Sequence, residues 1–176
     1  MSQGESNMQK ARETEYNALR AEILKRIELR NQIVLGSLTL AGLALSLGAN
    51  VPTIALVYPL ISVFLAAAWV QNDLAIKRIG KYIREQLEPK VDGLNWQTYL
   101  HTAAESTTSV MGLRFNILAA GGVFLVTQLV SLLVGPLKVT AFSIVDWALG
   151  VIAILCSVVT VLLIHRAAKH GQSFNK

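Results

Sequence analysis

Residues that could carry out enzymatic chemistry are few in this chain of 176 residues. His101 and Glu105 are four positions apart, so they would share one face of a helix formed within 91–108, but a catalytic zinc site needs about three protein ligands. The doublet Gly121-Gly122 lies in an apolar stretch rather than in a phosphate-binding loop, and the chain has one cysteine. We therefore expect a non-enzymatic protein without metal or cofactor. A membrane enzyme that uses His101 and Glu105 is a further alternative.

A second group of polar residues stands inside the third long apolar stretch. Thr127, Gln128 and Ser131 fall within one turn or so of helix, and the amide of Gln128 is too costly to leave facing hydrocarbon. Two interpretations follow. These side chains either form hydrogen bonds between helices of one bundle, which is the favoured interpretation, or they line a pore formed by several copies.

The helices that would hold this polar group are predicted from long intervals without charged residues. Between Arg30 and Asp73 there are 42 consecutive residues without Asp, Glu, Lys, Arg or His, about twice the roughly 20 that one membrane crossing requires. The interval predicts a hairpin of two spans, 33–48 and 53–69, separated by a Gly-, Asn- and Pro-containing turn. Pro59 lies inside the second span and should bend it near Tyr58, toward a neighbour that satisfies the freed carbonyl.

Two further intervals predict a second pair of spans. The 23 residues 115–137 carry no charge, and the 19 residues 147–165 carry no Asp, Glu, Lys or Arg. The chain is therefore expected to be an all-α polytopic membrane protein with four transmembrane helices and additional amphipathic cytoplasmic helices. The predicted divisions are an N-terminal helix (1–31), a first hairpin (32–71), an amphipathic linker (72–114), a second hairpin (115–165) and a basic tail (166–176).

The distribution of cations predicts the orientation. With both termini on one side, 15 of the 16 Lys and Arg residues lie on that side, which the positive-inside rule assigns to the cytoplasm. The spans have no Asp, Glu, Lys or Arg in their interiors, which argues against an ion-coupled carrier.

Two amphipathic segments flank the first hairpin. One apolar stripe runs from Tyr16 to Ile27, and another occupies 74–88 after the polar sequence Gln71-Asn72-Asp73. The second segment is expected to lie at the bilayer surface, where its basic residues would contact anionic headgroups: Lys77, Arg78, Lys81 and Arg84. The cations alternate with glutamates and lack interleaved stacking aromatics, so nucleic acid is not expected as a partner.

The sequence around these segments resembles a group of small bacterial four-span membrane proteins. The resemblance rests on Glu15-Tyr16, Leu19-Arg20 and Glu22-Ile23, on Tyr82-Ile83-Arg84 with Glu88-Pro89, and on Gly93-Leu94 with Trp96, and it covers most of the first hundred residues. It implies a bacterial inner-membrane setting but no activity. The plan of a short helical cytoplasmic part on a few spans is also similar to membrane effectors of phage-defence systems.

These features together predict a self-associating scaffold or interaction module in the lipid bilayer. Its two amphipathic segments would face a cytoplasmic protein partner or lipid headgroups. The alternative is a pore-forming effector, in which Thr127, Gln128 and Ser131 would face the lumen.

Overall fold

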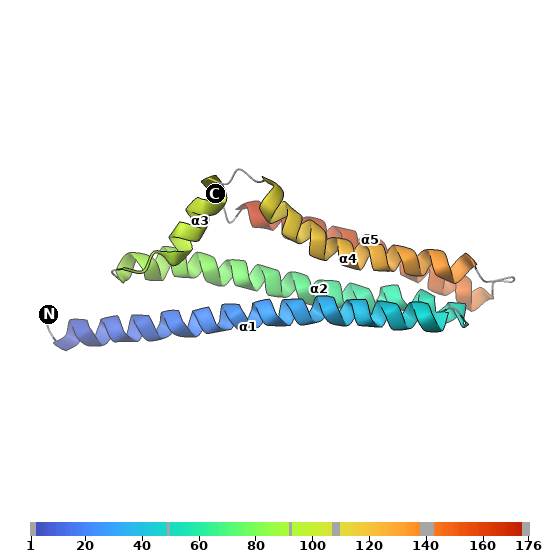
Figure 1. Ribbon diagram of the computed structural model, residues 1–176, viewed down its shortest axis with the longest axis horizontal. Helices are drawn as coiled ribbons and strands as arrows, with labels where there is room; N and C mark the ends of the chain where they lie inside the picture. The colour runs from blue at the N-terminus through green and yellow to red at the C-terminus, as the bar shows by residue number, and fades with distance from the viewer. Residues whose placement is uncertain (1–2, 49, 92, 107–109, 138–142, 174–176) are drawn as a thin grey trace.

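The computed structural model describes residues 3–48, 50–91, 93–106, 110–137 and 143–173, and no strand occurs among them. The predicted all-α class is therefore confirmed. Figure 1 shows an elongated molecule in which two long antiparallel helices are covered along part of their length by a second pair. The helices are α1 (Gln3–Gly48), α2 (Pro52–Tyr82), a π-helical turn η1 (Ile83–Leu87), a 3-10 turn η2 (Glu88–Lys90), α3 (Trp96–Ser106), α4 (Val110–Leu137) and α5 (Ile144–Ser173).

The first two helices form a close hairpin. Gly48 ends α1 and Pro52 begins α2, where a missing N–H costs nothing because the first turn has no acceptor for it. A Cβ built on Gly48 would lie 2.8 Å from the Cβ of Ala55, so a glycine allows the two backbones to approach. The turn between α1 and α2 therefore lies where the sequence predicts it.

Both helices run on without interruption past the apolar interval. The predicted boundary at 31–32 lies inside α1, so the N-terminal helix and the first apolar stretch form one continuous helix. The segment 74–88, expected as a separate surface helix, instead continues α2 to Tyr82 and then η1. Polar residues at 71–73 do not break a helix that satisfies them. Asn72 Nδ2 donates to the carbonyl of Ala68 at 3.0 Å, and Asp73 forms ion pairs.

The polar halves of α1 and α2 pack on each other and, with η1, η2 and α3, form the part that we call the arm (residues 3–29, 74–91 and 93–106). Its core contains Tyr16, Ile83 and Leu87, flanked by Leu19, Ile23, Ile79 and Leu94. The two predicted apolar stripes therefore bury one another. A partner or a bilayer must contact the arm through other residues.

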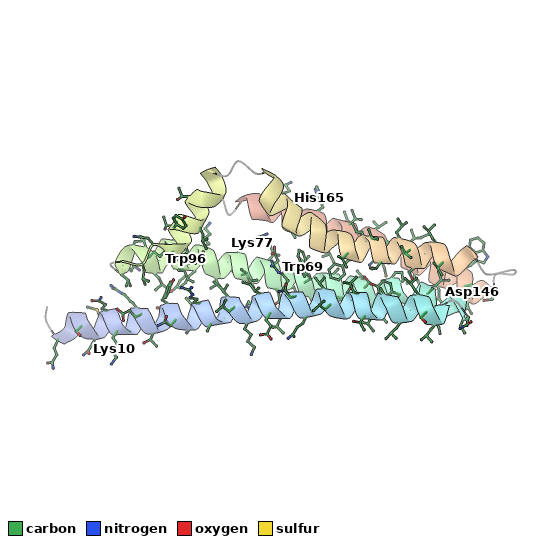
Figure 2. The ribbon with its side chains drawn as sticks, viewed as in Figure 1. Lys10, Trp69, Lys77, Trp96, Asp146 and His165 are labelled. Carbon is green, nitrogen blue, oxygen red and sulfur yellow. The ribbon has the colours of Figure 1, made fainter. Side chains whose placement is uncertain are left out.

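Helices α4 and α5 pack on the apolar halves of α1 and α2, a part that we call the bundle (Figure 1). Trp69 of α2 and Phe124 of α4 are buried there with ring centroids 6.5 Å apart. A Cβ on Gly121 would lie 2.9 Å from Cγ2 of Ile164, so Gly121 marks a close contact between α4 and α5. Figure 2 shows Trp69 between the hairpin and this second pair.

Three helices, α1, α2 and α5, are long and apolar enough to cross a membrane, and the described apolar stretch of α4 is the shorter Gly121–Val134. The outer surface of the bundle is rich in large apolar side chains. Leu35 is 64% exposed, Phe64 68% and Leu129 57%. Such a continuous apolar exterior is what a membrane-embedded protein presents to lipid.

Candidate functional site

The polar residues of α4 point into the bundle of one chain. Gln128 is fully buried, and its Nε2 donates to Oγ1 of Thr160 on α5 at 3.0 Å. Oγ1 of Thr127 lies 2.8 Å from Oη of Tyr58 on α2. Tyr58 Oη in turn donates to the backbone carbonyl of Ser37 on α1 at 3.3 Å. One chain of contacts thus connects α1, α2 and α4, and a second connects α4 to α5.

Ser131 completes this set at a position where a proline has removed a backbone donor. Pro59 has no N–H to give to the carbonyl of Ala55, four residues earlier in α2. The Ser131 hydroxyl donates to that carbonyl. Ser131 is therefore the neighbour that the sequence required but could not identify.

These contacts bear on the pore hypothesis. Thr127, Gln128 and Ser131 face α2 and α5 of their own chain, so lining a lumen between copies would require the hydrogen bonds to break. In the described part of the chain, Gln128 Oε1 and Ser62 Oγ are buried without a hydrogen-bond partner. Tyr58 and Thr160 contact Thr127 and Gln128 from neighbouring helices. The sequence does not single them out, because hydroxyl residues are common in membrane spans.

The predicted surface cations are mostly neutralised. Lys77 Nζ lies 2.7 Å from Asp73 Oδ2, while Lys81 and Arg84 lie 3.8 Å and 3.4 Å from Oε1 of Glu85. Arg78 is exposed and forms no ion pair with a described residue. A headgroup site built on all four residues would have to compete with these carboxylates.

A buried ion-pair network joins the arm to the bundle. Asp73 is 5% exposed, and its Oδ1 accepts a hydrogen bond from Arg30 of α1 at 3.0 Å while Oδ2 contacts Lys77. We call these three residues the junction. Asp73 was predicted only as the end of an apolar interval, because sequence does not show which cation a carboxylate will meet.

The arm exposes an aromatic patch beside α3, made of Arg20, Trp96 and Tyr99. The Arg20 guanidinium carbon lies 5.8 Å from the Trp96 ring centroid, and Trp96 stacks on Tyr99 with centroids 6.3 Å apart. Trp96 is 49% exposed and Tyr99 64%. Figure 2 places Trp96 where α3 begins, on the arm. Trp, Tyr and Arg are the residues that most often dominate protein–protein binding energy.

A buried glutamate holds this patch in place. Glu88, 5% exposed, accepts hydrogen bonds from the N–H of Thr98 at 2.9 Å and from its hydroxyl at 2.6 Å, and also from the N–H of Gln97. These amides belong to the first turn of α3, which has no internal acceptors. Gly93 has φ of 87°, a conformation that suits glycine, and allows the chain to turn from η2 into α3.

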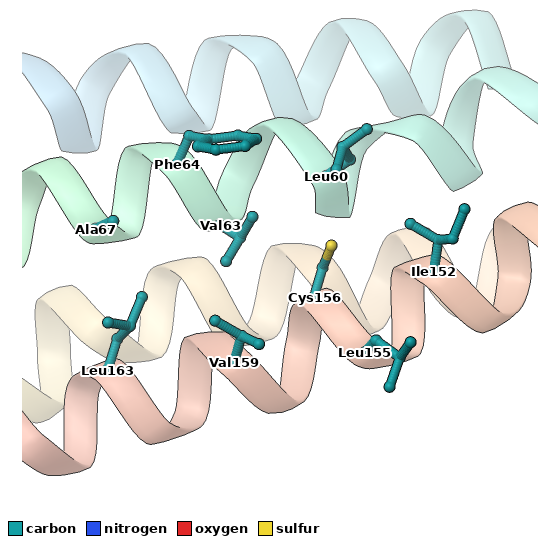
Figure 3. Close-up of a pocket in the computed structure, with 9 residues that line it drawn as sticks. All are labelled: Leu60, Val63, Phe64, Ala67, Ile152, Leu155, Cys156, Val159 and Leu163. Carbon is teal, nitrogen blue, oxygen red and sulfur yellow. The ribbon is translucent and has the colours of Figure 1, made fainter.

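An apolar groove lies on the outer surface between α2 and α5. It has a volume of about 390 Å³. Figure 3 shows side chains from both helices around it, including Leu60, Phe64 and Ala67 of α2 and Cys156, Val159 and Leu163 of α5. No sequence motif distinguishes these residues from the other apolar residues of the same helices.

The enzymatic alternative gains no geometric support. His101 and Glu105 both lie on α3, but their side chains are outside the described residues. Among the side chains that are described, no group of three His, Cys, Asp or Glu could hold a metal ion.

No protein-family model, curated protein or solved structure matches the chain. The resemblance to small bacterial membrane proteins therefore has no further support from these comparisons.

Proposed function

We propose that the chain is a non-enzymatic, four-span membrane protein that self-associates in a bacterial inner membrane and presents its arm to a cytoplasmic protein partner. The spacing of the polar residues at the two ends of each apolar segment supports the proposed spans. Arg30 to Gly48 in α1 covers 18 helical steps, and Thr53 to Asp73 in α2 and Asp146 to Arg166 in α5 cover 20 each. These lengths are about 27 Å and 30 Å, close to the thickness of a bilayer core. The charge-free interval in α4 supplies the fourth crossing, with both termini on the basic, cytoplasmic side.

The observation that carries this proposal is the continuity of α1 and α2 from the bundle into the arm. Neither helix is interrupted at the junction, where Arg30, Asp73 and Lys77 join them through a partly buried network. The arm is thereby held in one orientation relative to the spans. A rigid, membrane-anchored surface of this kind suits a scaffold, because a partner does not have to order a flexible segment on binding.

The aromatic patch is the surface that we expect the partner to contact. A photoreactive amino acid in place of Leu100, which is 41% exposed on α3, should form a discrete adduct in intact cells. In that background Trp96→Ala should reduce the adduct by about tenfold or more, because truncating a central aromatic costs roughly 2 kcal/mol or more. The measurement is the adduct yield on immunoblots of membrane fractions.

Met8→Ala is the matched control for this experiment, because Met8 is 56% exposed on α1 outside the patch. Its adduct should stay at the unsubstituted level. An adduct that survives Trp96→Ala, or that Met8→Ala removes equally, would show that the patch does not bind the partner.

Self-association is assigned to the outer face of α1. Thr39, Gly42 and Ser46 are exposed at helical spacing, and a Cβ on Gly42 would meet no atom within 4 Å. A helix of a second copy can approach such a face closely. Gly42→Ile should therefore reduce crosslinked dimer in native membranes by about fivefold, the effect of a loss of roughly 1 kcal/mol. Gly36→Ile is the control, because Gly36 has equally free space at its Cβ but is half-buried and lies about 120° around the helix from Gly42; equal dimer yields in the two variants would disprove the assignment.

A further inference from the structure

The groove between α2 and α5 has the chemistry and the dimensions of a site for one lipid chain. Its lining is apolar, and it opens on the outer surface of the bundle (Figure 3). Its volume of about 390 Å³ is within the roughly 300–1,000 Å³ of small-molecule sites. A helix of another protein is about 10 Å across and would lie over such a groove instead of entering it.

The groove covers the middle of the proposed spans and continues toward the Arg166 end of α5. From Ile152 to Leu163, α5 rises by about 16 Å, and Leu163 lies three residues, about 5 Å, before Arg166. The register of the two helices is fixed at their other end, where the Thr53 hydroxyl donates to Asp146 Oδ1 at 3.0 Å. Figure 2 labels Asp146 in the first turn of α5 and His165 nearer the other end of that helix. Since α2 and α5 run in the same direction, this register places Arg166 level with Asp73, at the cytoplasmic edge of the spans.

Two arginines follow the groove at that edge. Arg166 comes three residues after Leu163 and therefore continues the groove face of α5. On α2 the stripe of Leu60, Phe64 and Ala67 continues to Gln71 and Arg78 at the same spacing. Arg78 and Arg166 are both exposed, and neither forms an ion pair with a described residue. An apolar groove that ends at unpaired guanidinium groups complements a molecule with a long apolar chain and an anionic head.

We propose that this groove binds one acyl chain of an anionic phospholipid of the cytoplasmic leaflet, with its phosphate on Arg166 and the outer part of its headgroup toward Arg78. Guanidinium pairs with phosphate through two parallel N–H donors. In a zwitterionic lipid, the charge of the phosphate is already neutralised in part by the cation of the headgroup. The inference rests on the four-span topology proposed above, and it assigns the site to a lipid rather than to a second protein chain.

Native mass spectrometry of the full chain in detergent tests this proposal. Dioleoylphosphatidylglycerol and dioleoylphosphatidylcholine are added separately at equal concentration, and the fraction of protein with one bound lipid is measured. We expect at least about fivefold more retained phosphatidylglycerol, equivalent to about 1 kcal/mol, the contribution of one cation near an anionic lipid. Arg166→Gln should lower the retention of phosphatidylglycerol to the level of phosphatidylcholine.

Two further variants separate the site from general attraction. Lys25→Gln removes the same charge from an exposed position on α1 and should leave the preference unchanged. Cys156→Phe fills the groove and should lower retention of both lipids, with helicity by circular dichroism kept at the unsubstituted level. Equal retention of the two lipids by the unsubstituted chain, an equal loss in Arg166→Gln and Lys25→Gln, or full retention in Cys156→Phe would each overturn the site.

Failure of the lipid site and failure of the proposed function give different results. A chain that inserts into vesicles but shows no lipid preference lacks only this site. A chain recovered folded in buffer without detergent would refute the membrane topology itself.

Discussion

Asp73→Ala is expected to lower the free energy of unfolding by about 3–5 kcal/mol, the usual cost of removing one partner from a buried ion pair. The side chain of Asp73 is 7% exposed, and those of Arg30 and Lys77 are both 19% exposed, so the variant leaves two largely buried cations without their carboxylate. The measurement is denaturation of the detergent-solubilised chain in mixed micelles, followed by circular dichroism.

Two comparisons make this result specific to the junction. Glu22→Ala removes an ion pair with Arg26 at an exposed position, where side-chain exposures are 33% and 45%, and should cost about 0.5 kcal/mol or less. The triple variant Asp73→Ala, Arg30→Met, Lys77→Met should recover most of the loss, because apolar replacement of a whole buried network is often neutral. A single variant as stable as Glu22→Ala would show that the junction does not hold the arm to the bundle.

The helices and their polar ends follow from properties that are local in the sequence. Gly48 and Pro52 mark the hairpin turn because glycine allows close approach and proline suits a first helical position. The apolar stretch around Thr127, Gln128 and Ser131 also predicts buried hydroxyl and amide groups that need partners. Their pairing with Tyr58, Thr160 and the Ala55 carbonyl depends on how α4 packs against α2 and α5. The local sequence does not indicate how distant helices will pack.

The arm was harder to predict for the same reason. Gln71, Asn72 and Asp73 suggest a break between a span and a surface helix when they are considered alone. Arg30, 43 positions away, pairs with Asp73 and makes a continuous α2 favourable. Likewise the apolar stripes at Tyr16 and Ile83 indicate helix faces that need burial, yet each stripe could equally have met lipid. Only the hairpin geometry of α1 and α2 brings them together.

Glu88→Ala is expected to release α3 while leaving the bundle intact. The carboxylate accepts from the N–H groups of Gln97 and Thr98 and from the Thr98 hydroxyl, and its removal leaves the first turn of α3 without these acceptors in a partly buried location. Hydrogen bonds to a charged group contribute about 1.5–3 kcal/mol each and do not add fully. We expect a loss of about 3 kcal/mol, measured as a roughly hundredfold faster amide hydrogen exchange within 96–106.

Glu85→Ala is the matched control, since Glu85 lies three residues earlier with its side chain 45% exposed, and it should change exchange in α3 little. The two variants also separate the structural role of Glu88 from the binding role of the aromatic patch. Trp96→Ala should remove the partner adduct without changing exchange in α3. Glu88→Ala should remove the adduct because Trp96 and Tyr99 lose their fixed positions beside Arg20. If exchange in α3 rises in Glu88→Ala while the adduct stays, the partner does not require an ordered patch, and the rigid-arm proposal is wrong.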